Sequence, residues 1–206
     1  MKPTAPALLL CAALATGLPP DQPAGAQQPG ATAAVAKPSP DMLAAAQVLQ
    51  HLGAARAITE GQGARVLTIF FDPNCPYCRQ LYGDLRPFVG KDDLRLRWVP
   101  VAILAPSSPG KAAAILQSAD PLQAFREMED HGLDPNRPAP AQLSAGQISA
   151  KTRQALKTND AVLKHAGVYY SVPLAVFRNR EGQPQLLLGA PRGEKALAEL
   201  LRTVGP

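Results

Sequence analysis

The stretch VLTIFFDPNCPYCRQ, residues 66–80, decides how the rest of the chain is interpreted. Its first part, residues 66–71, is almost continuously apolar and rich in β-branched and aromatic side chains, which is typical of a central strand buried on both faces. An Asp-Pro-Asn turn ends this strand. The CPYC tetrapeptide at 75–78 then opens a predicted helix, with Asn74 as its N-cap and Pro76 in its first turn. The sequence therefore places a CxxC motif between a buried strand and the start of a helix.

This position gives the two cysteines different chemistry. Cys75 is predicted to lie where unpaired backbone N–H groups and the positive end of the helix dipole stabilise a thiolate. Its pKa should therefore fall below the free value of about 8.5, into the range of about 3.5–7.5. A thiolate of low pKa attacks disulfides and is also a good leaving group. Cys78, three residues on, faces the same side and can resolve a mixed disulfide, so the pair is predicted to pass two electrons.

A zinc site and a structural disulfide are the two alternative roles for the cysteine pair. A structural zinc ion needs four ligands, and the chain offers no second CxxC and only three scattered histidines, His51, His131 and His165. A purely structural disulfide would close so short a ring that it would constrain the unfolded chain very little. We therefore expect neither a metal nor a cofactor, and a chemical rather than structural role for the two thiols.

The amino-terminal residues have the pattern of a secretory signal. Lys2 supplies a positive charge, and the apolar stretch over residues 7–18 is shorter than the roughly 20 residues that a membrane span needs. Ala24-Gly25-Ala26 is a small-x-small cleavage site, so we predict a signal peptide over residues 1–26, cleaved after Ala26. Cleavage of the signal peptide would remove Cys11. We expect no stable insertion of the chain into a membrane.

Composition indicates one folded domain with a tail. The 206 residues are 46% hydrophobic, which suffices for a core, and the net charge of +5 comes from scattered Lys and Arg. The densest basic cluster is only Arg95 and Arg97, so we expect no nucleic-acid partner. Of the 22 prolines, eight fall in the first 40 residues, and residues 27–40 are predicted to form a mobile tail.

The remaining periodicities predict an α/β protein with a mixed sheet. A short helix is expected over residues 41–52, with Asp41 as its N-cap. The elements expected after the motif are a strand at 94–104, helices at 111–117, from 121 onward and at 149–166, a hairpin of strands 174–177 and 185–188, and a final helix at 193–203.

The sequence also resembles a known family. The segment FFDPNCPYCRQ, residues 70–80, is similar to the active site of the bacterial periplasmic disulfide isomerases and reductases DsbC and DsbG, and most similar to DsbG. The resemblance continues through segments 86–88, 106–116, 120–121 and 167–173, and covers about residues 54–204. It implies a thioredoxin-like fold with a helical insertion. The implied domains are a tail with a short linker helix at 27–63 and a catalytic domain at 64–206, with the insertion at about 107–166.

The same resemblance implies a set of site residues and partners. Cys75 and Cys78 would be the catalytic, redox-active pair, and Pro173 would be a cis-proline that faces them. Substrate would contact Pro76, Tyr77, Val172 and Pro173. The family commonly has Thr before this proline, so Val172 removes a hydroxyl near Cys75. The implied substrates are exported proteins with disulfides or oxidised cysteines. The implied reductant is a membrane protein like DsbD, and the implied location of this chain is the periplasm.

Two other functions fit the same residues. Val172 resembles the residue of the oxidase DsbA, so the chain could instead donate disulfides. It could also be a chaperone or binding module in which the cysteines are bystanders. DsbC and DsbG dimerise through an amino-terminal domain, whereas only residues 27–63 precede the catalytic strand here. We therefore expect a monomer, or a dimer assembled differently through the helix at 41–53.

Overall fold

The computed structural model describes residues 37–134, 136–138 and 140–206. The predicted signal peptide, and the tail up to residue 36, lie outside the described residues. The described elements, in chain order, are α1 (Pro40–His51), η1 (Leu52–Ala54), β1 (Ile58–Glu60), β2 (Arg65–Phe71), α2 (Pro76–Leu85), η2 (Arg86–Phe88), β3 (Leu94–Pro100), α3 (Ser108–Gln117), α4 (Pro121–Leu133), η3 (Ala145–Gln147), α5 (Ala150–His165), β4 (Leu174–Arg178), β5 (Pro184–Leu188) and α6 (Gly193–Thr203).

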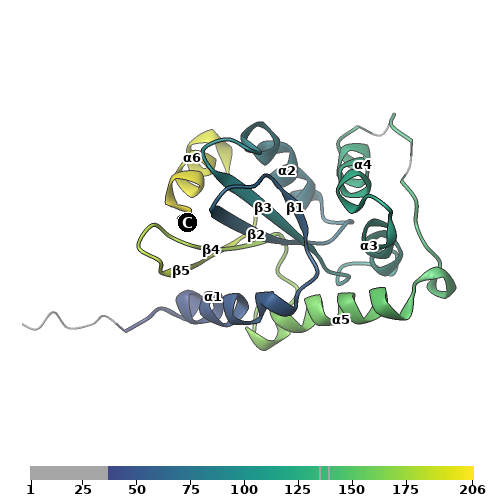
Figure 1. Ribbon diagram of the computed structural model, residues 1–206, viewed down its shortest axis with the longest axis horizontal. Coiled ribbons are helices and arrows are strands. Elements are labelled where there is room, and N and C mark those ends of the chain that lie inside the picture. The colour runs from purple at the N-terminus through teal and green to yellow at the C-terminus, as the bar shows by residue number, and fades with distance from the viewer. Residues whose placement is uncertain (1–36, 135, 139) are drawn as a thin grey trace, which may run out of the picture. The chain divides into compact units, whose positions relative to one another are not determined.

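The five strands form one mixed sheet in the order β1-β3-β2-β4-β5 (Figure 1). Strands β2 and β3 are parallel, and the other neighbours are antiparallel. The predicted α/β fold with a mixed sheet is thus confirmed. The apolar stretch at residues 66–71 lies in β2, the central strand, and residues 67–71 are buried. Because β2 is the central strand, the CPYC segment that follows its carboxyl end lies near the middle of the sheet's width, beyond the ends of the strands.

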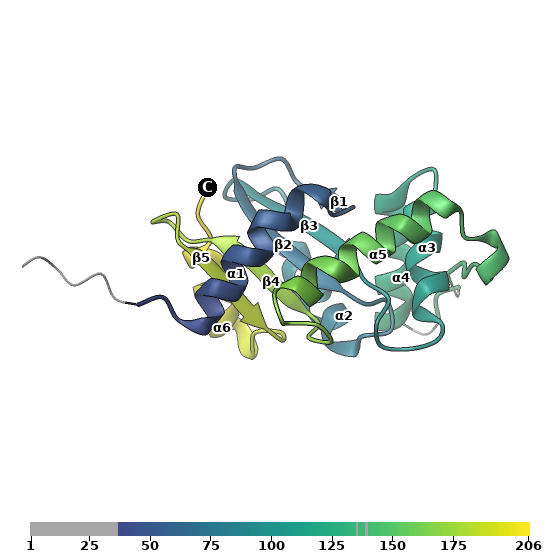
Figure 2. The same cartoon turned by 90° about the horizontal axis from the view of Figure 1, so that it is seen from below.

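Helices cover both faces of the sheet. Side chains on β2 alternate, so Leu67, Ile69 and Phe71 join a core that includes residues of α2, α4 and α6. Phe70 points to the opposite face, into a second core with residues of α1 and α5. Figure 2 shows α1 and α5 lying across this second face. Burial on both faces is the reason that β2 is apolar without alternation.

Strand β3 ends earlier than expected. The apolar pattern predicted a strand to residue 104, whereas β3 ends at Pro100. The backbone N–H groups of Ile103 and Leu104 donate to the Asp72 carboxylate, at 2.8 and 3.0 Å, instead of to a neighbouring strand. A side chain at the end of β2 therefore turns the chain away from the sheet.

Two features near the amino end also differ from expectation. Helix α1 begins at Pro40, and its N-cap is Ser39, whose hydroxyl accepts the Met42 N–H at 3.2 Å, in place of Asp41. Strand β1 was not expected, and it pairs with β3 at the sheet edge. Both elements precede residue 64, where we expect the catalytic domain to begin, yet both contact its strands.

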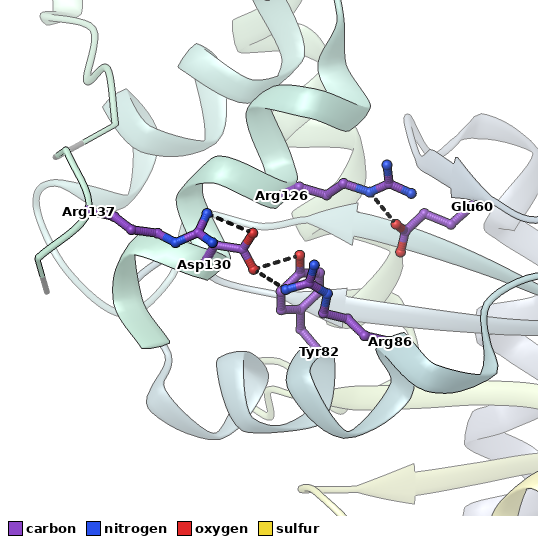
Figure 3. Close-up of polar contacts among 6 residues, drawn as sticks. All are labelled: Glu60, Tyr82, Arg86, Arg126, Asp130 and Arg137. Atoms are coloured by element: carbon purple, nitrogen blue, oxygen red, sulfur yellow. Dashed lines mark hydrogen bonds and ion pairs between the residues drawn. The ribbon is translucent and has the colours of Figure 1, made fainter. Parts of the chain in front are cut away.

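The helices between β3 and β4 include α4, which packs against α2 and β1. Polar contacts fix this position (Figure 3). Asp130 on α4 accepts hydrogen bonds from Tyr82 at 3.0 Å and Arg86 at 2.6 Å, and it pairs with Arg137 at 3.2 Å. Arg126, also on α4, pairs with the buried Glu60 of β1 at 2.8 Å. These contacts hold α4 beside the helix that begins with the CPYC segment.

Candidate active site

Helix α2 begins at the motif itself. Cys75 is its N-cap, with extended backbone angles of φ −83° and ψ 114°, and Pro76 is the first helical residue. The prediction of Asn74 as N-cap was therefore wrong by one residue. The Asn74 side chain instead donates to the Ser108 hydroxyl at 2.9 Å and accepts from Lys111 at 2.7 Å. It connects the motif to the start of α3 rather than to α2.

The two thiols are free, and their pKa values shift in opposite directions. The backbone N–H of Cys78 donates to the Sγ atom of Cys75 at 3.1 Å. The pKa of Cys75 is lowered, chiefly by a hydrogen bond from the Cys78 side chain, with smaller contributions from backbone N–H groups and against the opposing effect of burial. Burial raises the pKa of Cys78. The site therefore pairs one thiol whose pKa is lowered with an inner thiol whose pKa is raised.

The segment expected to face the cysteines does so. Val172 lies 97 residues beyond Cys75 in the chain, and the Cys75 thiol is 3.6 Å from the Val172 carbonyl oxygen, to which it can donate. The Val172–Pro173 peptide bond is cis, as expected. Within the motif, the Tyr77 side chain is 63% exposed. The structure thus brings the predicted site residues together, with an exposed aromatic ring beside two nearly covered sulfur atoms.

Asp72 is a site residue that the sequence analysis missed. It is fully buried at the end of β2. One carboxylate oxygen accepts from the Asn74 N–H at 2.9 Å and from the Ser108 hydroxyl at 2.8 Å, and the other accepts from the loop after β3. The Asp72 carbonyl also accepts the Cys75 N–H at 2.8 Å. An acidic residue directly after an apolar strand was the available signal for this role.

Glu129 on α4 was also missed. Its side chain is buried, although it carries a carboxyl group. The signal was its spacing: Phe125, Met128 and Glu129 follow the period of one helix face, and the first two are apolar. Within the described ranges, no group of three or more His, Cys, Asp or Glu side chains is arranged to hold a metal ion.

A central strand that leads into a CxxC at the start of a helix, faced by a cis-proline, defines a thioredoxin-like protein. A family model described as a thioredoxin-like domain matches residues 52–205, and the chain belongs to this family. Its resemblance to the DsbC and DsbG group is confirmed by two curated relatives. The thiol:disulfide interchange protein DsbG of Pseudomonas aeruginosa is 34% identical over 66% of this chain and 51% of its own length. DsbG of Escherichia coli is 31% identical over 61% of this chain and 48% of its own length.

The chain therefore spans about half the length of the curated relatives it matches. Among solved structures, the catalytic domain of Proteus mirabilis ScsC has a TM-score of 0.57 at 17% identity, and the match covers 77% of this chain and 96% of that domain. This likeness supports the fold. No helix in the described part of the chain is long and apolar enough to cross a bilayer.

Proposed function

We propose that this protein exchanges disulfides with exported proteins through Cys75 and Cys78. The Cys75 thiolate attacks one sulfur of a substrate disulfide, forms a mixed disulfide and releases the other sulfur as a thiolate. Cys78 then attacks the Cys75 sulfur, which forms the Cys75–Cys78 disulfide and releases the second substrate thiolate. The dithiol loses two electrons and the substrate gains them. The observation that carries this proposal is the hydrogen bonding from Cys78 to the Cys75 sulfur.

The surface around Cys75 suits an extended substrate segment. Pro76 and Tyr77 are exposed beside the sulfur, and the Val172 carbonyl approaches it from the opposite side. Backbone atoms next to Pro173 would pair with the substrate chain, and Tyr77 would contact its side chains. The similarity to DsbG supports exported proteins with disulfides or oxidised cysteines as substrates, and a periplasmic location. The proposed cleavage after Ala26 rests on the signal-like pattern of residues 1–26. A membrane reductant like DsbD belongs to the same proposal, since the periplasm is oxidising.

Two cysteine variants test this function. In an insulin reduction assay with dithiothreitol, we expect the wild-type chain to accelerate reduction and Cys75→Ser to abolish the acceleration. Cys78→Ser should accumulate mixed disulfides because the resolving thiol is missing. The ultraviolet absorbance of the thiolate should give Cys75 a pKa below the free value of about 8.5. An ordinary pKa, or full activity of Cys75→Ser, would contradict the proposal and favour a binding module.

The direction of electron flow needs a separate measurement. Val172 leans slightly towards the oxidase alternative, because it resembles the residue that the oxidase DsbA has before its proline. Equilibration of the Cys75–Cys78 pair with glutathione distinguishes the two directions. A potential near that of thioredoxin, about −270 mV, would support a reductase, whereas one near about −120 mV would support an oxidase.

A further inference from the structure

We propose that Glu129, on the inserted helix α4, accepts the proton of the Cys78 thiol, and that Arg79 and Gly132 position it for this task. The inference rests on the proposed function, because a resolving thiol must lose its proton before it attacks. It assigns a chemical role to the helical insertion, which lies outside the strand, loop and helix that carry the cysteines themselves.

The burial of Glu129 is the first observation. Its side chain is 1% exposed, and its Oε1 atom has no hydrogen-bond partner among the described residues. A buried polar atom without a partner is unfavourable, and a buried charge without a partner is more unfavourable still. Such groups are rare in folded proteins and concentrate at functional sites. A carboxyl oxygen without a partner is also free to take up a proton.

Arg79 links the motif to the helix that carries Glu129. It follows Cys78 directly in α2, and its side chain crosses α4 at Gly132. A Cβ atom on Gly132 would lie 1.7 Å from the Arg79 Nε atom, so only glycine leaves room for the guanidinium. The Arg79 Nε atom also lacks a partner within the described residues. Glu129 and Gly132, three residues apart on α4, share one helix face, and this face lies against the residue after Cys78.

The charges around Glu129 support proton transfer near neutral pH. Burial raises the pKa of Glu129 to about 8, Arg79 and Lys111 lower it, and Cys75 and Asp72 raise it. The charge of Glu129 in turn raises the pKa of Cys78, so the two groups are electrostatically coupled. An acceptor works best when its pKa lies close to the working pH. Glu129 is therefore a stronger base than an exposed carboxylate would be.

The proposed step balances as follows. In the mixed disulfide, the Cys78 thiol gives its proton to the Glu129 carboxylate. The Cys78 sulfur forms a bond with the Cys75 sulfur, and the bond between Cys75 and the substrate breaks. The substrate leaves as a thiolate, and Glu129 later releases its proton to solvent. No oxidant or reductant beyond the substrate disulfide is required.

Reaction of the reduced full chain with 5,5′-dithiobis(2-nitrobenzoate) separates the two steps. Attack by Cys75 releases the first thionitrobenzoate, and attack by Cys78 on the mixed disulfide releases the second. We expect Glu129→Gln to slow the second release by about tenfold or more, since positioned bases contribute about 10²–10⁴-fold. The rise of the second rate around pH 8 should disappear. The matched control is Glu127→Gln, the same change at an exposed position of α4, which should leave both phases unchanged.

Gly132→Ala provides a second test, which keeps the carboxyl and favours the helix. Its Cβ must displace Arg79, so the pH dependence of the second release should move to higher pH. Unchanged second-phase rates and pH profiles in Glu129→Gln would overturn the inference while leaving the proposed function intact; if that variant does not fold, an unchanged profile in Gly132→Ala decides in the same way. A wild-type chain whose first phase is as slow as that of an ordinary thiol would instead overturn the proposed function, and this inference with it.

Discussion

At the scale of single residues, Cys75, Cys78 and Asp72 have different functions in the site. Cys75 accepts a hydrogen bond from the Cys78 side chain and weaker ones from backbone N–H groups at the helix start, and these lower its pKa. Cys78, one turn later, points into the core, and burial raises its pKa. The start of one short helix therefore shifts the pKa values of its two thiols in opposite directions, as the proposed exchange of disulfides requires. Asp72 fixes the loop that precedes them, because both of its oxygens accept hydrogen bonds.

Glu129 makes a prediction about stability that is independent of catalysis. Its folded-state pKa of about 8 lies above the ordinary value of 4.5, so the folded chain holds a proton that the unfolded chain releases between these values. Stability from this group is therefore complete below about pH 4.5 and is lost as pH rises towards 8, by at most about 1.4 kcal/mol per pH unit. Urea unfolding at pH 5 and pH 7.5 should show Glu129→Gln becoming more stable relative to wild type at the higher pH. A constant difference between the two proteins would contradict this.

The sequence alone was sufficient for some of these residues and not for others. Cys75 and Cys78 carry their chemistry in a local motif, and Pro173 was recognised from the resemblance of its segment. The roles of Glu129 and Arg79 depend on contact between helices whose sequences lie about 50 residues apart, with Gly132 making room between them. No local pattern encodes that contact. Asn74 was misassigned because it and the adjacent Cys75 can both cap a helix.

At the scale of elements, sequence periodicity predicted the central strands and the flanking helices. It did not predict the edge strand β1 or the point at which β3 ends. Strand β1 has three residues, which is too few to show alternation, and its buried Glu60 resembles a solvent-exposed residue in the sequence. That carboxylate is satisfied by Trp98 of β3 at 2.8 Å and by Arg126 of α4. The end of β3 was misjudged because the side chain of Asp72, the residue after β2, accepts the N–H groups that would have continued the strand.

The contact between α2 and α4 depends on Asp130, and its loss should destabilise the protein. Asp130→Ala leaves the buried Tyr82 hydroxyl without its acceptor and separates Arg86 and Arg137 from their shared carboxylate (Figure 3). We expect a loss of about 2–4 kcal/mol, moderated because both arginines are half-exposed. Tyr82→Phe removes one neutral donor and keeps the ring, so about 1 kcal/mol is expected. Urea unfolding of both variants checks the order, and equal losses would contradict it.

At the scale of the whole molecule, α1 decides whether a surface is left for self-association. The expected linker helix is packed on its own chain: it contacts β4, β5 and α5, and its Ala45 and Val48 are completely buried there. Of its apolar side chains, Leu43 is 52% exposed. A helix whose apolar face is already covered has little left to offer a second copy.

We therefore expect the protein to be a monomer in solution, and this bears on its activity. Isomerisation benefits from two sites that face one cleft, whereas reduction of a single disulfide or oxidised cysteine needs only one pair of thiols. Light scattering after gel filtration should give the mass of one chain at all concentrations tested. Leu43→Glu is the matched control, since it changes the exposed residue of α1 and should leave this mass unaltered. A mass of two chains that Leu43→Glu reduces to one would contradict the expectation, show that α1 forms an interface, and restore the case for an isomerase.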